Sequence, residues 1–71
     1  MAKSRIQNRV KEYRERVGMT QFELAVAAHM MPAAVSEIES GKREPGLTTA
    51  LNLAKALETT VDGLFELEKE G

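Results

Sequence analysis

Cysteine is absent from the 71-residue chain, and histidine occurs once. Without cysteine, neither a disulfide framework nor a thiolate metal site can form, which is typical of proteins from a reducing cytoplasm. One histidine cannot build a zinc site unaided. We therefore expect no metal and no other cofactor.

Long apolar runs are also missing. No run approaches the length of about 18 residues that a membrane span needs, so no membrane association is predicted. The N-terminal residues MAKSRIQNRVK lack an apolar signal core, so nothing directs export and we expect a cytoplasmic protein. There is no Ser/His/Asp set and no glycine-rich phosphate loop, and a chain this short is not expected to form a deep pocket. These absences argue against an enzyme and against a small-molecule substrate.

Charge of one sign is not in excess, because the net charge is −1, which argues against indiscriminate binding to polyanions. The distribution is uneven. Residues 1–18 carry six basic and two acidic residues, whereas residues 58–71 carry five acidic residues and one lysine. One end could therefore face a polyanion while the other faces away. Alternatively, both are solvated helix surfaces, and charge alone favours this second interpretation.

The hydrophobic content of 42% suits a single globular domain over residues 1–71 with a small core. Its first predicted helix covers about residues 6–17. Four apolar residues follow there at helical spacing, at Ile6, Val10, Tyr13 and Val17. Ser4 and Gln7 have the spacing of a capping box at the start, and Gly18 suits the end.

Two shorter helices are predicted at about residues 21–28 and 32–40. A T-x-x-E capping box begins at Thr20, Pro32 suits the first turn of the second helix, and Gly41 suits its end. Their apolar faces consist of Leu24, Ala25, Ala28, Val35 and Ile38. Helices this short are marginal alone and must be braced by other segments. Two braced helices joined by a short turn are the arrangement of a helix-turn-helix motif.

Two further helices are predicted at about residues 48–57 and 61–65. Thr48 or Thr49 could cap the first, and Thr59 or Thr60 could cap the second. Leu67 alternates with charged residues in a tail that fits either a frayed helix end or a short strand. Elsewhere no segment carries a strong strand signal. The expected fold is therefore all-α, a compact bundle of five short helices.

Several ordered motifs run along the chain: Val10-Lys11-x-x-Arg14, Gly18-Met19-Thr20-Gln21-x-x-Leu24-Ala25, Val35-Ser36-x-Ile38-Glu39-x-Gly41-Lys42-Arg43-x-Pro45, Ala50-Leu51-x-Leu53-Ala54-Lys55-Ala56-Leu57 and Val61-Asp62-x-Leu64-Phe65. Their order and spacing resemble the Cro/CI-type helix-turn-helix regulators, also called the xenobiotic-response-element (XRE) family. The resemblance covers about residues 8–66 and leaves residues 1–5 and 67–71 as loose ends. It implies a lambda-repressor-like DNA-binding domain, with the helix-turn-helix in the second and third helices. It also implies a homodimer that binds double-stranded DNA as a sequence-specific transcriptional regulator, most often a repressor.

The resemblance also implies which residues meet DNA. The third helix would read the major groove. Gln21 would touch a phosphate, Ala34 would touch the backbone, and Lys42 and Arg43 would meet phosphate. The positions that read bases in the family are occupied here by Met31, Pro32, Ala33 and Glu37.

Three further positions have structural meanings in the family. Arg14 and Glu39 would form a partly buried ion pair, so we expect them to support the scaffold. His29 replaces the usual turn glycine and would need a positive φ, which histidine tolerates better than most residues. We interpret His29 as a turn residue and not as a ligand or an acid–base catalyst.

The start of the reading helix is unusual, because Pro32-Ala33-Ala34 can contact only a thymine methyl group or fit a DNA shape. A carboxylate at Glu37 could accept from a cytosine amino group, but near phosphates it is costly unless paired. Lys42, Arg43, Arg9 and Lys11 would supply phosphate contacts without a base code. We therefore predict modest affinity with strong salt dependence.

An alternative function is a protein-interaction module, of the antitoxin or adaptor type, that keeps the fold with weak or no specific DNA reading. Two features favour it: the start of the third helix carries no hydrogen-bonding side chain, and the net charge is slightly negative. Dimerisation is expected through the fifth helix and the tail, where Phe65 and Leu67 exceed what a small monomer needs to bury.

Overall fold

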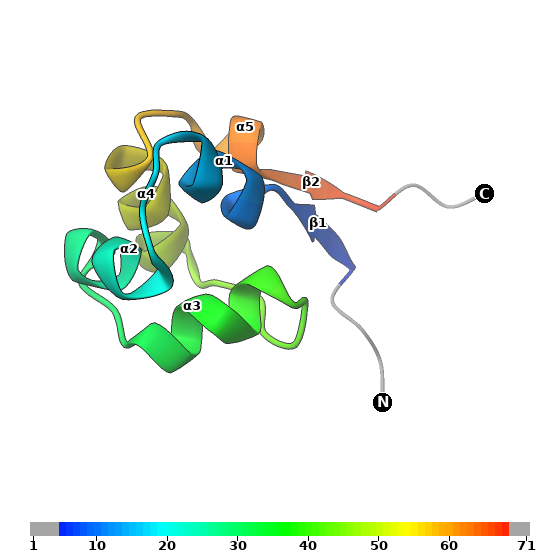
Figure 1. Cartoon of the computed structure of the whole chain (residues 1–71). Helices are drawn as coiled ribbons and strands as arrows, with labels where there is room; N and C mark the ends of the chain where they lie inside the picture. The colour runs from blue at the N-terminus through cyan, green and yellow to red at the C-terminus, as the bar shows by residue number, and fades with distance from the viewer. Residues whose placement is uncertain (1–4, 69–71) are drawn as a thin grey trace.

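The computed structural model describes residues 5–68. Along the chain these form β1 (Ile6–Asn8), α1 (Val10–Arg16), α2 (Gln21–Ala28), α3 (Pro32–Glu39), α4 (Leu47–Ala56), α5 (Val61–Leu64) and β2 (Phe65–Leu67). The helices gather into one body, and the two strands form a ribbon that extends from one side of it (Figure 1). Among the described residues, no helix is long and apolar enough to cross a membrane.

The ribbon corrects the predicted start of the first helix. Residues 6–8 form a strand that pairs antiparallel with β2, in a register that places Ile6 opposite Leu67 and Asn8 opposite Phe65. The strand alternative therefore holds for the tail, and Leu67 is paired instead of lying in a loose end. Ile6 fits a helical stripe equally well, so the periodicity was ambiguous and the distant partner strand decided the conformation.

Helix α1 begins later than predicted because its first turn is fixed by other contacts. The backbone of Arg9 is not helical, and its N–H donates to the carbonyl of Leu64 at 2.8 Å. Asn8 Oδ1 accepts from the N–H of Val10 at 3.3 Å, while Asn8 Nδ2 donates to the carbonyl of Ile38 at 2.9 Å. Gln7 lies in the strand and cannot cap a helix, and Ser4 and the arm of residues 1–4 lie outside the described residues.

Helices α2 and α3 follow the prediction closely. Thr20 forms the complete capping box with Glu23, with both hydrogen bonds present at 2.8 and 3.0 Å. Helix α2 ends at Ala28, and its C-cap residue His29 has a φ of 61°, which confirms the left-handed turn. Pro32 opens α3, and Gly41 follows its end at φ 82°.

Helices α4 and α5 confirm two predicted helices and correct one cap. Gly46, and neither threonine, is the N-cap of α4, because its carbonyl already accepts from the N–H of Ala50 at 2.9 Å. Thr60 caps α5 by accepting from the N–H of Gly63 at 3.0 Å. Between the helices, Glu58 adopts a φ of 57° that the sequence did not indicate, since no glycine marks that turn.

The core is built from all five helices of the described region. Its buried members are Val10, Leu24, Ala25, Ala28, Val35, Ile38, Leu53, Ala54, Leu57 and Leu64. Tyr13, Met30 and Phe65 are partly buried against it. Three residues of the predicted apolar stripes lie outside it, because Val17, Leu47 and Leu51 are exposed. Leu47 and Leu51 are one helical turn apart, so α4 carries an apolar stripe on its outer side.

Candidate nucleic-acid interface

Helix α3 lies at the edge of the body, with its buried side against α2 and α1 and its first turn open to solvent (Figure 1). Val35 and Ile38 anchor it in the core. Met31, Pro32 and Ala33 are exposed at its start, and Ala34 is half-buried. The apolar anchors therefore fix the helix while leaving one long side free for a ligand.

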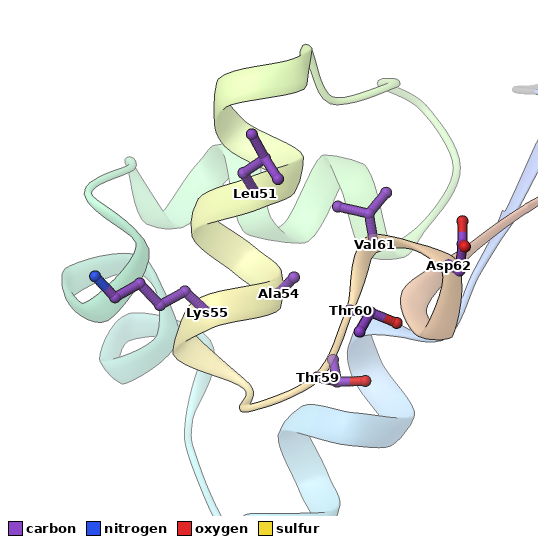
Figure 2. Close-up of a pocket in the computed structure, with 7 residues that line it drawn as sticks. All are labelled: Leu51, Ala54, Lys55, Thr59, Thr60, Val61 and Asp62. Atoms are coloured by element: carbon purple, nitrogen blue, oxygen red, sulfur yellow. The ribbon is translucent and has the colours of Figure 1, made fainter.

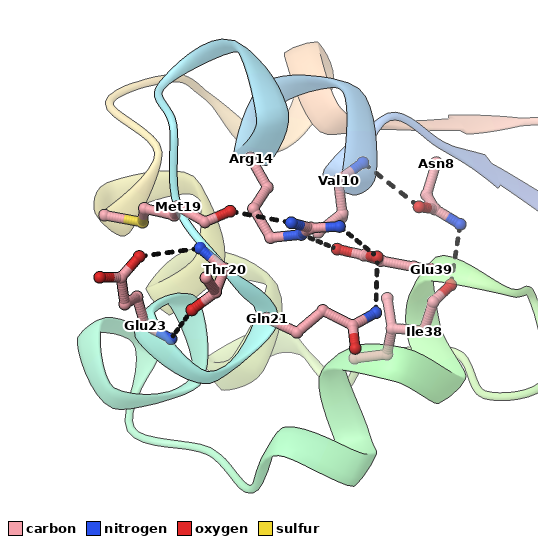
Figure 3. A network of polar contacts seen from close by, with 9 residues as sticks. All are labelled: Asn8, Val10, Arg14, Met19, Thr20, Gln21, Glu23, Ile38 and Glu39. Carbon is pink, nitrogen blue, oxygen red and sulfur yellow. Dashed lines mark hydrogen bonds and ion pairs between the residues drawn. The ribbon is translucent and has the colours of Figure 1, made fainter.

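A buried polar network ties α1, α2 and α3 together (Figure 3). Arg14 Nε lies 2.7 Å from Glu39 Oε2, and Arg14 Nη2 lies 3.2 Å from Glu39 Oε1. The side chains are 11% and 5% exposed. Arg14 Nη1 also donates to the carbonyl of Met19 at 2.8 Å. This is the ion pair that the resemblance implied, and its two parallel bonds are the strong geometry for arginine and carboxylate.

The same carboxylate holds Gln21. Its Nε2 donates to Glu39 Oε1 at 3.0 Å, so the amide at the start of α2 is fixed relative to α3 (Figure 3). The hydrogen bond with Glu39 raises the pKa of the Arg14 guanidinium against the opposing effect of burial. The guanidinium therefore stays charged throughout the physiological range.

A polar hollow of about 190 Å³ lies beside this network. It is lined by Lys11, Gln21, Ser36, Glu39 and Ser40. Donors on α1, α2 and α3 meet there: the ammonium of Lys11, the amide of Gln21 and the hydroxyl of Ser36. The hydroxyl of Ser40, which follows α3, donates to the carbonyl of Glu37. Ser36 and Ser40 are not among the DNA contacts that the sequence implies, although Pro32, Ser36 and Ser40 follow at intervals of four residues, which places them along one side of α3 and its C-cap.

Glu37 and Arg43, both expected to meet DNA, contact each other. Arg43 Nη2 lies 2.6 Å from Glu37 Oε1, and Arg43 Nε donates to the same oxygen at 2.7 Å. The carboxylate that would be costly near phosphates is thus neutralised within the protein. Lys42, next to this pair, is exposed.

Arg9 is not brought to this surface as a free cation. Its Nη2 lies 2.8 Å from Glu66 Oε1 on β2, and this hydrogen bond raises the pKa of the Arg9 guanidinium. Pairing of β1 with β2 also places part of the basic N-terminal segment beside part of the acidic C-terminal segment. Where β1 and β2 pair, these two parts lie side by side, and the charges of Arg9 and Glu66 offset one another.

No group of three or more histidine, aspartate or glutamate side chains within residues 5–68 is arranged to hold a metal ion. His29 is exposed at the end of α2, where its backbone makes the turn into α3.

Comparison with known proteins gives the family. A helix-turn-helix family model, HTH_3, matches residues 10–64. The HTH-type transcriptional regulator YgzD of Bacillus subtilis is 35% identical over 65 residues, which cover 92% of this chain and 98% of the relative.

Two solved structures are similar in fold. The restriction-modification controller protein C.AhdI of Aeromonas hydrophila gives a TM-score of 0.75 at 31% identity, covering 78% of this chain and 83% of that chain. The DNA-binding domain of the P22 c2 repressor gives a TM-score of 0.74 at 28% identity, covering 76% and 71%. The chain therefore belongs to the helix-turn-helix family of the Cro/CI or XRE type and is a DNA-binding transcriptional regulator.

Proposed function

We propose that this regulator acts as a homodimeric repressor that inserts α3 into the major groove of double-stranded DNA. The observation that carries the proposal is the surface of α3: its start is exposed, Lys42 and Arg43 follow just beyond its far end, and a polar hollow lies on one side. A helix presented in this way suits the width of the major groove. Such a protein works by binding alone, in the cytoplasm, and needs neither a catalytic group nor a cofactor.

The proposed DNA contacts are Gln21, Met31, Pro32, Ala33, Ala34, Glu37, Lys42 and Arg43. Gln21 begins α2, so a phosphate there would meet both its amide and the free N–H groups of the helix start. Lys42 is an exposed cation beyond the end of α3, where it can contact the next phosphates of the DNA backbone. Lys11 and Ser36 add donors at the hollow. Met31 and Ala33 offer apolar surface to a thymine methyl group.

Repression follows from occupancy of the operator, because a compact protein bound across a promoter blocks access to it. The P22 c2 protein, whose DNA-binding domain has this fold, is named as a repressor. This likeness supports the same role for the present chain.

Dimerisation is proposed through α4 and α5. Leu47 and Leu51 are 74% and 53% exposed on α4, and Leu51 borders a groove of about 430 Å³ that Val61 lines from α5 (Figure 2). A second copy that covers this stripe would bury both leucines. The sequence alone favours Phe65 and Leu67 for this interface instead. Phe65 packs on the core of its own chain, which leaves Leu67 as the exposed apolar side chain of the ribbon.

Selection of bound sequences from random double-stranded DNA, repeated at several salt concentrations, tests the proposal. A dimeric reader should select two inverted half-sites whose centres are about 10 base pairs, or one helical turn, apart. Affinity should fall steeply with salt as phosphate counterions are released. Absence of any binding at low salt would overturn the proposal.

One observation favours the alternative of a protein-interaction module. Phe22 and Val26 are exposed one turn apart on α2, and Met31 is 72% exposed at the start of α3. Exposed apolar side chains of this size suit a protein partner. The two functions separate in one measurement: for a module of this kind, Lys42→Ala would leave the biological response unchanged, whereas for a repressor it would weaken operator binding and repression together.

A further inference from the structure

The pair formed by Glu37 and Arg43 has a backbone support that fixes its position. The carbonyl of Glu37 accepts from the N–H groups of Lys42 and Arg43 at 2.9 and 3.2 Å, and from Ser40 Oγ at 3.2 Å. Gly41, at φ 82°, makes the reversal that these bonds require. The chain beyond α3 thus folds back, so that Arg43 starts beside the last turns of the recognition helix.

The side chains of Arg43 and Glu37 also contact each other. Arg43 Nε donates to Glu37 Oε1 at 2.7 Å, and Arg43 Nη2 lies 2.6 Å from the same oxygen as an ion pair, although the two side chains are 57% and 42% exposed. The guanidinium is held over the surface of α3 and not directed away from it. Glu37 lies one turn after Ala33, on the side of the helix that starts with small exposed residues.

The geometry leaves one edge of the guanidinium available. A guanidinium has five N–H donors in a planar fork, and the Glu37 carboxylate lies against its Nε and Nη2 side, where it accepts from Nε. Within residues 5–68, the Nη1 group of Arg43 has no hydrogen-bond partner. The Nη1 and Nη2 edge of this exposed side chain therefore keeps two parallel donors for a ligand, and guanine presents two acceptors, O6 and N7, in the major groove.

We propose that Arg43 is the specificity-determining residue of this regulator, reading a guanine through its Nη1 and Nη2 edge, and that Glu37 is the positioning residue that orients it. This inference rests on the proposed insertion of α3 into the major groove. It changes the two roles implied by family resemblance, in which Arg43 meets phosphate and Glu37 reads a base.

Two physical points favour this assignment over a phosphate contact. A phosphate bound by Arg43 would lie close to the Glu37 carboxylate, and the two negative charges would repel. A guanine edge is uncharged, and its acceptors complement the donors that remain. The remainder of the exposed start of α3 consists of Met31, Pro32 and Ala33, which offer no hydrogen-bonding side chain, so this pair supplies base recognition that they lack.

The experiment uses the full chain and the sequence that the wild type selects from random DNA. Arg43→Ala should lose the preference for guanine at one position of each half-site, by about tenfold to a hundredfold, and keep the other preferences. Glu37→Gln should weaken the preference at that same position, and Lys42→Ala should weaken binding to all sequences equally. Circular dichroism checks that each variant is folded.

Replacing the selected guanine with 7-deazaguanine identifies the contact, because only the N7 acceptor is removed. Wild-type affinity should then fall several-fold, while that of Arg43→Ala should not change further. If Arg43→Ala weakens binding to all sequences equally, Arg43 binds phosphate, and the inference is overturned while the proposed function stands. If instead Glu37→Ala alone removes a preference for cytosine and 7-deazaguanine has no effect, Glu37 is the reader and the inference is again overturned. If the wild type selects nothing, the proposed function itself fails.

Discussion

Arg14 in α1 and Glu39 at the end of α3 are joined by two hydrogen bonds, of 2.7 and 3.2 Å, with little of either side chain exposed. The pair links two helices that are distant in sequence, and Glu39 also accepts from Gln21 on α2. Loss of one partner therefore leaves a buried charge without its counterion. This relationship makes the end of α3 depend on a residue that does not belong to the helix-turn-helix.

Substitution of Arg14 by methionine should lower the free energy of unfolding by about 3–5 kcal/mol, because Glu39 would remain buried and unpaired. Urea unfolding followed by circular dichroism measures the change. The matched control is Arg16→Met on the same helix. Arg16 pairs with Glu12 at 2.7 Å, but both side chains are exposed, so its loss should cost less than about 1 kcal/mol. Equal losses in the two variants would show that the buried pair does not stabilise the fold.

His29→Gly should raise the free energy of unfolding by up to about 1 kcal/mol. The backbone of His29 has a φ of 61°. This left-handed region costs a residue with a side chain about 1–2 kcal/mol and costs glycine nothing. Glycine offsets part of that gain in stability, because it raises the conformational entropy of the unfolded chain. Urea unfolding measures the effect. The control is Ala27→Gly, two residues earlier inside α2. It raises the entropy of the unfolded chain without relieving any strain, so its free energy of unfolding should fall by about 1 kcal/mol. A similar decrease in the free energy of unfolding for both variants would contradict strain at His29.

Lys42→Ala should weaken binding to all DNA sequences by a similar factor and reduce the slope of log affinity against log salt by about one. The reason is that a lysine that meets phosphate releases a counterion and carries no base code. Fluorescence anisotropy with a selected and a scrambled duplex, at several salt concentrations, measures both quantities. Arg16→Ala is the control of equal charge, because Arg16 is exposed on α1, outside both the proposed DNA contacts and the groove beside α4 and α5. Equal slopes for the two variants would remove Lys42 from the interface.

Local signals were sufficient to predict α2 and α3. The capping box at Thr20, the proline at the start of α3 and the glycine after it each act within one turn of their own position. The left-handed φ at His29 was also predicted, but from family resemblance. The Arg14–Glu39 pair came from the same source, because nothing in the spacing of two residues 25 positions apart indicates contact.

The ribbon and the Glu37–Arg43 pair could not be predicted in this way. Strand β1 depends on β2, about 60 residues later, and its three residues fit a helical pattern as well as an extended one. The Glu37–Arg43 contact depends on how the turn at Gly41 returns the chain along α3. Both features arise from tertiary geometry. They matter because the ribbon occupies Arg9, an expected phosphate ligand, and the pair changes what Arg43 can bind.

The exposed stripe on α4 leads to a prediction about assembly. In a symmetric dimer each substitution occurs twice across the interface, so one glutamate in the stripe introduces two buried charges and removes two buried leucines. We expect the wild type to sediment as a dimer at tens of micromolar. Leu51→Glu should raise the dimer dissociation constant at least about a hundredfold.

Sedimentation velocity over a range of concentrations measures this, and Val26→Glu is the matched control, since Val26 is an exposed apolar residue on α2 outside the stripe. The control should remain dimeric. Loss of the dimer should also weaken binding to a full operator far more than binding to a single half-site, because the second half-site no longer adds its contacts to the same complex. Equal weakening on both duplexes would place the effect of Leu51→Glu in the fold and not in the dimer, and a monomeric wild type at tens of micromolar would exclude an obligate dimer.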